Sequence, residues 1–159
     1  MVQISYPSGV RLTETHTSPE FAVGTRAEGS DGSKWVYVKA ASAITLGYWV
    51  AIDSTYAAAA PLTKANAILG YEIGWASQAA IAASSYGWVQ TKGLGAGFVG
   101  ASVASGVALY TSAVDGMLDD AASAAGTAYA KIAGVEVVTT QGAANTVANV
   151  IATFPYAAI

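Results

Sequence analysis

The sequence predicts a mainly β protein, a small β-barrel or sandwich of about eight short strands with an extended N-terminal arm. Two observations lead to this fold class. β-branched and aromatic residues gather in short runs bounded by Gly, Asn, Asp or Pro, a pattern typical of strands. The alanine-rich segments lack the three- and four-residue apolar spacing of a packed helix over more than about two turns. We therefore expect at most one short helix.

Residues 1–33 are expected to form the arm, and residues 34–159 the β domain. Residues 1–34 carry seven of the seventeen charged side chains of the chain, which has seven basic and ten acidic residues. Proline and glycine interrupt any helical period there, and the polar cluster at 28–33 is typical of a turn. No basic region followed by an apolar run is present at the N-terminus, so we expect no secretion signal and a mature protein that starts at residue 1.

Two segments of the expected β domain resemble each other. Residues 34–40 and 86–93 both contain Trp-Val-x-x-Lys and are expected to be strands. Each is followed by a stretch with a central glycine, at 44–50 and at 103–109, which predicts two similar β-hairpin units and leaves an internal duplication open. Further strands are expected at residues 67–75, 109–112, 129–139 and 147–154. The alanine-rich candidates for a short helix are residues 56–60, 78–83 and 121–130.

The composition limits the possible partners. Hydrophobic residues make up 53% of the chain and charged residues 11%, against roughly 25% charged residues in an average soluble domain. We therefore expect part of the apolar surface to face other subunits. Seven scattered basic residues and a net charge of −3 do not suit a phosphate backbone, so nucleic acid is not expected as a partner. Charged and polar residues interrupt the most apolar stretch, 56–89, so no membrane span is expected.

The residues that usually carry catalysis are scarce. His16 is the only histidine, its nearest carboxylates in the sequence are Glu14 and Glu20, and the chain has no cysteine. No Ser-x-x-Lys motif is present to suggest a serine–lysine pair. We interpret His16 as a surface residue and expect the protein not to be an enzyme.

One glycine pattern favours an enzymatic alternative. Gly95 to Gly100 matches Gly-x-Gly-x-x-Gly, the fingerprint of dinucleotide-binding enzymes. Gln90 and Lys92 interrupt the preceding strand, which should be wholly apolar in such a fold. Too few residues follow Gly100 to complete a doubly wound sheet. We therefore expect a flexible glycine-rich loop between strands, and no cofactor.

Two further clusters have a functional and a structural interpretation. The acidic cluster at 115–120 either holds Ca²⁺ or forms a solvated turn, and we expect a turn with no metal. Trp35, Trp49 and Trp88 lie within expected strands, where packing in the core or an interface is the ordinary role of such rings. A glycan-stacking platform is the alternative.

Several glycine-containing segments resemble the β-barrel decoration proteins of tailed bacteriophages, over roughly residues 35–155. They are Leu69-Gly70-Tyr71-Glu72-Ile73-Gly74, Tyr86-Gly87-Trp88-Val89-Gln90, residues 102–110 and Gly116-Met117-Leu118-Asp119. The resemblance implies a structural virion protein, usually trimeric, on the outer surface of the head. It would bind the major capsid protein and stabilise the expanded lattice by mass action. A glycan- or receptor-binding β module of a tail or cell surface is the alternative function.

The N-terminal arm is the expected capsid-binding element. Its apolar side chains are spaced along an extended chain that suits a groove or sheet edge of a partner, and two arginines suit capsid carboxylates at the rim. An ordinary disordered terminus is the alternative. The candidate capsid-binding residues are Ile4, Tyr6, Val10, Arg11, Leu12, Phe21, Val23 and Arg26.

Overall fold

The computed structural model describes residues 10–67, 69–121, 123–124 and 127–158. The structure is 45% strand and 3% helix, so the expected mainly β fold is confirmed. The single helix of the described residues is one turn long, α1 at Lys64–Ala67. It lies outside the three alanine-rich candidates. No helix in the described part of the chain is long and apolar enough to cross a membrane.

Twelve strands are formed by the described residues, more than the eight expected, because four of them have only two residues. Ten belong to one mixed sheet, and β9 and β10 form a separate hairpin. The strands are β1 (Arg26–Glu28), β2 (Lys34–Lys39), β3 (Trp49–Ile52), β4 (Ala60–Pro61), β5 (Glu72–Trp75), β6 (Tyr86–Val99), β7 (Leu109–Thr111), β8 (Leu118–Asp119), β9 (Ser123–Ala124), β10 (Thr127–Ala128), β11 (Lys131–Val137) and β12 (Thr146–Ala158).

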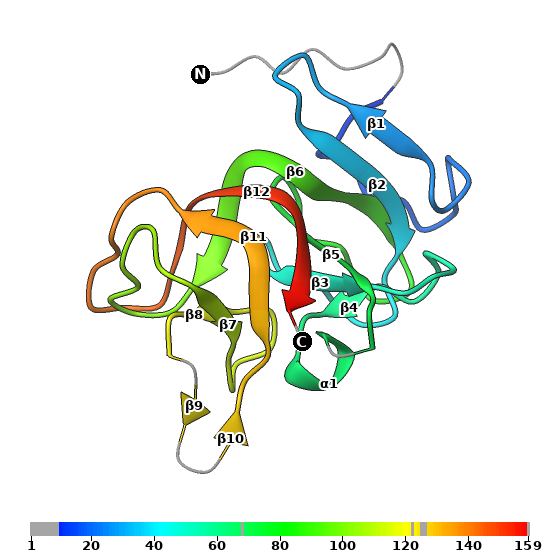
Figure 1. Ribbon diagram of the computed structural model, residues 1–159. Coiled ribbons are helices and arrows are strands. Elements are labelled where there is room, and N and C mark those ends of the chain that lie inside the picture. Colours follow the sequence, from blue (N-terminus) through cyan, green and yellow to red (C-terminus); the bar gives the residue numbers. More distant parts are fainter. Residues whose placement is uncertain (1–9, 68, 122, 125–126, 159) are drawn as a thin grey trace.

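Two long, bent strands organise the sheet. β6 has 14 residues and β12 has 13, and both curve across the molecule in Figure 1. The hydrogen-bonded order β12-β11-β7-β8-β6 is closed by a direct β12–β6 pairing. This closure makes a small five-stranded barrel at one end of the fold, with a single parallel pair, Val99 with Leu118, at the β6–β8 junction.

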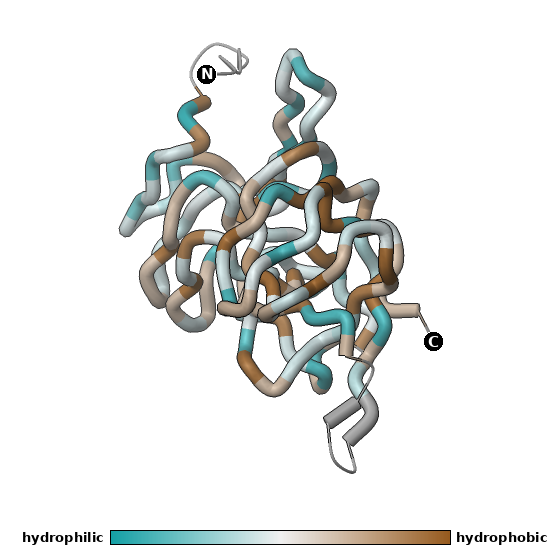
Figure 2. Tube along the Cα trace, turned by 90° about the vertical axis from the view of Figure 1, so that its left-hand side faces the viewer, coloured by the Kyte–Doolittle hydropathy of each residue, from teal (hydrophilic) through white to brown (hydrophobic). Residues whose placement is uncertain are grey.

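The other half of β6 builds the second part of the sheet. Residues 86–92 pair antiparallel with β2, so the two Trp-Val-x-x-Lys segments lie side by side, with Tyr37 opposite Trp88. β1 extends this edge, and β5 and β3 follow on the other side. Figure 2 shows polar residues at the tip of the β1–β2 hairpin and apolar residues running through the body of the molecule.

Neither of the two expected hairpin units is formed. Residues 34–52 contain two strands, but β2 pairs with β1 and β6 whereas β3 pairs with β4 and β5, and Trp49 rather than Ile44 begins the second strand. Residues 101–108 form turns, and only Leu109 enters a strand. The sequence expectation for 103–109 was therefore wrong, because Val103 is held by burial in the core rather than by strand pairing. The expected strand at 67–75 begins only at Glu72.

Within the part of the chain that the structure describes, the buried residues form three clusters. The largest fills the barrel, and all five barrel strands contribute to it together with Trp49 and Trp75. The second lies on one face of β2 and contains Val36 and Val38. The third lies on the opposite face of β2 and contains Trp35, Tyr37, Trp88, Leu12 and Ala27. Both faces of β2 are therefore covered, and the four tryptophans are each at most 1% exposed.

The N-terminal segment supplies the cover for the third cluster. Regular structure begins at β1, eight residues before the expected start at Lys34, and β1 pairs with β2. Phe21 packs edge-on against Tyr37 and Trp88 at ring separations of 5.3 and 5.4 Å. Residues 10–28 thus pack on the β domain instead of projecting as an arm. The physical reason is that Trp35 and Tyr37 leave a second apolar face on β2, which needs a covering layer.

The glycine fingerprint lies inside β6, not in the flexible loop that was expected. Gly95 and Gly97 face the barrel interior, where an added Cβ would lie 2.8 Å from Trp75 Nε1 and 3.0 Å from Trp49 Cζ2 respectively. The strand leads into turns rather than a helix, so the strand–loop–helix context of a dinucleotide site is not formed. These glycines allow β6 to approach the tryptophans closely.

Gly95→Ala is expected to lower the free energy of unfolding by about 1–3 kcal/mol, the usual effect of overpacking a close-packed core. Its Cβ would also lie 2.6 Å from Gln90 Oε1, an acceptor already used by the Ser77 hydroxyl. Urea denaturation measures the change. Gly142→Ala is the control, because a Cβ there meets nothing within 4 Å, and it should stay within about 0.5 kcal/mol. Equal effects of the two substitutions would contradict this account of Gly95.

Candidate functional site

An exposed apolar face on β6 and β12 is the first candidate site. The two strands place Leu94 opposite Ile151 and Phe98 opposite Val147, and directly opposite side chains in an antiparallel pair share a face. Leu94 is 57% exposed, Ile151 48% and Val147 44%. We call these four residues the β6–β12 face. Large aliphatic side chains gathered on one solvent face are typical of a protein contact.

A depression lies beside this face, where β12 pairs with the neighbouring strand β11. Glu136 of β11 lies opposite Ile151, and Gly134 interrupts the β11–β12 pairing with a positive φ of 76°. The resulting depression of about 410 Å³ is lined by Gly134, Val135, Glu136, Ile151 and Thr153. A concave surface with both polar and apolar lining residues and one carboxylate suits a protruding side chain of another protein.

A strained bulge follows at the end of the face. Between Ala152 and Tyr156, β12 contains three residues where β11 contains one, and Phe154 has a positive φ of 49°. This conformation costs a non-glycine residue of order 1–3 kcal/mol and is found preferentially at functional sites. Phe154 is 45% exposed and Tyr156 57%, with Lys92 Nζ 5.9 Å from the Phe154 ring centre. The bulge therefore presents two aromatic side chains to solvent next to the β6–β12 face.

A groove between the N-terminal segment and the sheet is the second candidate site. It has a volume of about 620 Å³ and is lined by Pro19, Glu20, Phe21, Ala22, Val23, Lys39, Ala57 and Tyr86. The Tyr86 ring stacks on Tyr37 at 6.1 Å, and Lys39 Nζ lies 5.7 Å from its centre. The groove is mainly apolar with one carboxylate and one ammonium group, which suits a small amphipathic ligand better than a phosphate.

His16 lies beside this groove and is less exposed than expected. Its side chain is 20% exposed, Nδ1 is 2.8 Å from the Tyr37 hydroxyl, and Nε2 is 2.6 Å from Glu20 Oε2. Burial raises the pKa of Tyr37, so this hydroxyl is neutral at physiological pH. Among the described residues, Glu14, His16 and Glu20 are the one group of three or more His, Asp or Glu side chains close enough to share a metal ion.

The described candidate capsid-binding residues make contacts within the chain. Leu12 is 1% exposed, and Val10 and Phe21 pack partly buried on the same cluster. Arg11 pairs with Glu14 at 2.8 Å, and Val23 lines the groove. Ile4 and Tyr6 lie outside the described residues.

Arg26 also has an internal partner instead of a free guanidinium. It donates two hydrogen bonds to Glu72, of 3.0 and 2.7 Å, and one of 3.2 Å to the Tyr56 hydroxyl. The hydrogen bonds to Glu72 raise the pKa of Arg26. Arg26 therefore joins β1 to β5, a contact between residues 46 positions apart that no local sequence pattern indicates.

The acidic cluster spans a turn at 115–116, the short strand β8 and the bend at Asp120. Asp119 Oδ1 accepts a hydrogen bond from Ala121 N at 3.4 Å, and Asp120 Oδ2 accepts one from Ala104 N at 3.2 Å. Asp120 thereby joins its own bend to the turns at 101–108. The expected turn is present at 115–116, and Leu118 and Asp119 continue into strand β8.

Sequence reasoning missed the β6–β12 face. The residue types from Thr146 to Thr153 gave no signal for it, because apolar residues occur on both the exposed and the buried side of this segment. Comparisons with protein-family models and with curated proteins gave no match to this chain.

Proposed function

We propose that this chain is a non-enzymatic structural protein of a tailed-phage virion, which binds the outer surface of the head and stabilises the expanded lattice. The resemblance of its glycine-bounded strand segments to phage decoration proteins supports this proposal, as does the mainly β fold. The observation that carries it is the β6–β12 face, an apolar surface on a chain with only 11% charged residues. Such a surface serves protein contacts rather than catalysis.

The chain acts as a homotrimer, and the β6–β12 face forms the contact between copies. Val147 and Ile151 are the aliphatic members of the exposed series of β12, with Asn149 between them, and Phe154 and Tyr156 lie at the end of the series. Exposed aromatic residues next to an apolar centre are typical of residues that dominate binding energy. The assembled trimer binds the major capsid protein, and several copies of each contact add avidity.

Ile151→Lys is expected to weaken self-association about 30-fold or more, the effect of losing a hot-spot residue worth roughly 2 kcal/mol. Light scattering after size-exclusion chromatography measures the mass across a concentration series. Stability should change by less than about 0.5 kcal/mol, because Ile151 is exposed in the single chain. Leu69→Lys is the matched control: Leu69 is 62% exposed but lies outside the β6–β12 face, so self-association should not change.

A wild-type chain that runs as a 16 kDa monomer at micromolar concentration would refute the trimer.

Phe154→Gly tests whether the bulge contributes to association independently of folding. Glycine relieves the positive φ, so stability should be kept while association falls.

Electron microscopy of expanded heads tests the virion role. Purified protein should decorate heads that lack it, and Ile151→Lys should not. Heads that remain bare at saturating protein would refute the role.

The glycan- or receptor-binding alternative has weaker support. All four tryptophans are buried, so a tryptophan stacking platform is not formed. The remaining location is the groove beside Tyr86, whose ring is already stacked on Tyr37. A glycan array on which the protein binds above background, with binding lost in Tyr86→Ala, would favour this alternative over decoration.

A further inference from the structure

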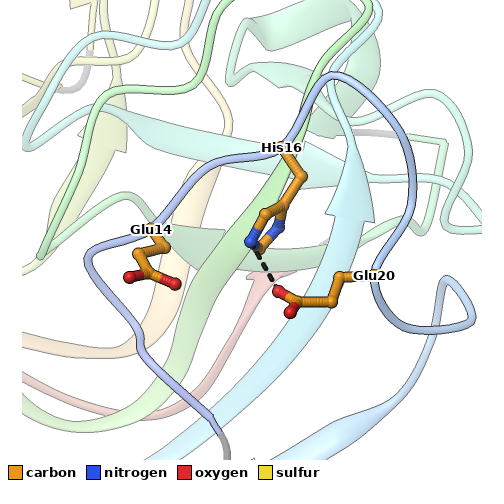
Figure 3. A group of neighbouring side chains, drawn as sticks. All are labelled: Glu14, His16 and Glu20. Atoms are coloured by element: carbon orange, nitrogen blue, oxygen red, sulfur yellow. Dashed lines mark ion pairs between the residues drawn. The ribbon is translucent and has the colours of Figure 1, made fainter.

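Three potential metal ligands converge in the segment that covers β2 and β6. Glu14, His16 and Glu20 each offer one ligand atom, and these atoms lie within 4.8 Å of one another. Figure 3 shows the two carboxylates on either side of the imidazole ring, both directed toward it. The spacing Glu-x-His-x-x-x-Glu brings them together because the chain between His16 and Glu20 turns back at the edge of the groove.

The surrounding contacts hold the histidine in place. His16 N donates to Tyr86 O at 2.9 Å, and Tyr86 N donates to His16 O at 2.8 Å, which fixes its main chain to β6. The Tyr37 hydroxyl lies 2.8 Å from Nδ1 and also accepts from Glu20 N at 3.3 Å. Ligating histidines in metal sites use the second ring nitrogen in the same way, to fix ring orientation and tautomer. The arrangement leaves Nε2 directed at the carboxylates.

The charges around the imidazole are also suitable. Two carboxylates face one neutral ligand, so a divalent cation would be balanced. Arg11 donates to Glu14 Oε1 at 2.8 Å, which leaves Oε2 of the same carboxylate for a metal ion. Mixed nitrogen and oxygen ligands favour zinc and its neighbours among the transition metals, whereas Ca²⁺ and Mg²⁺ prefer oxygen ligands alone.

We propose that Glu14, His16 and Glu20 bind one divalent transition-metal ion of the zinc class, through His16 Nε2 and one oxygen of each carboxylate. Water completes the coordination. The ion replaces the direct contact between His16 and Glu20 and joins residues 14–20 to β2 and β6 through Tyr37 and Tyr86. It fastens the segment that covers Trp88 and Tyr37, and stabilises the fold by mass action. This site is separate from the β6–β12 face and does not depend on the proposed function.

The test is a titration of the full chain with ZnCl₂ in a non-chelating buffer, followed by calorimetry and by NMR of the imidazole nitrogens. His16 is the only histidine of the sequence, so its signals need no assignment. We expect one ion per chain at micromolar concentrations, a large shift of the Nε2 resonance and a raised melting temperature. His16→Gln and Glu20→Gln should each weaken binding by at least about tenfold.

Asp120→Asn is the control for zinc held by other carboxylates, and it should leave the affinity unchanged. Glu14→Gln keeps the test decisive if His16→Gln does not fold, because Glu14 is exposed and its replacement is tolerated by the core. Absence of saturable binding up to millimolar zinc would overturn the proposal. Binding that leaves the Nε2 resonance in place, or that survives both His16→Gln and Glu14→Gln, would do so as well.

Discussion

Deleting residues 2–30 is expected to lower the free energy of unfolding by at least about 3–6 kcal/mol, since burying a Leu or Phe side chain contributes about 1.5–3 kcal/mol each. Leu12 is buried and Phe21 is packed on Tyr37 and Trp88. A loss of this size approaches the total stability of a typical small domain, about 5–15 kcal/mol. Denaturant melts followed by tryptophan fluorescence measure it, because Trp35 and Trp88 lie under the deleted segment.

A chain that lacks only residues 2–9 is the matched reference for this deletion. If residues 1–33 were an independent capsid-binding arm, the truncated chain would keep its melting temperature. Because residues 10–28 pack on the β domain, we expect the opposite result. Unchanged stability of the longer deletion would restore the arm interpretation. It would also mean that Leu12 contributes nothing to the core.

Trp88→Ala is expected to destabilise the chain by about 3–5 kcal/mol, the range for removing a large buried aromatic side chain. Trp88 is 1% exposed, and its ring contacts Tyr37 and Phe21 at separations of 5.1 and 5.4 Å. Its Nε1 has no hydrogen-bond partner among the described residues, so the loss comes from packing. Urea melts at matched concentration give the value.

Leu94→Ala is the control for Trp88→Ala, because Leu94 is 57% exposed and its truncation should change the stability of the single chain by less than about 0.5 kcal/mol. The melts are made at concentrations where the chain is monomeric, so that loss of a subunit contact does not enter. A loss below about 1 kcal/mol for Trp88→Ala would mean that the ring is exposed in solution. That result would favour the carbohydrate-binding alternative, in which exposed tryptophan rings stack on a glycan.

The strand segments around Trp35 and Trp88 were predictable from the sequence, and their bounds agree with β2 and the first half of β6. The mainly β class followed for the same reason, since β-branched side chains are restricted at χ1 and, like aromatic ones, pack well on a pleated surface. Local patterns also identified the turn at the acidic cluster. Each of these features depends on neighbours a few residues apart.

Features that depend on distant contacts were not predictable in the same way. Gly95 and Gly97 indicated a loop or a cofactor site, and only the position of Trp49 and Trp75 behind β6 explains them. The N-terminal segment has the composition of a free arm, yet it covers the second apolar face of β2. Trp35 and Tyr37 alternate with Val36 and Val38, so both faces of β2 carry apolar side chains that need to be buried. This pattern does not indicate which segment of the chain covers each face.

Residue types and local patterns are enough to give the strand-forming segments, the low charge content and the scarcity of residues that usually carry catalysis. The surfaces that remain open depend on the folded chain: the β6–β12 face with Val147 and Ile151, the groove beside Tyr86, and the group formed by Glu14, His16 and Glu20. The physical reason is that strand propensity is fixed by a residue and its neighbours, whereas exposure and ligand geometry arise only when β6 and β12 bend and close the barrel. Closure brings together side chains far apart in the sequence, such as Leu94 and Ile151, and leaves the face they share exposed to solvent.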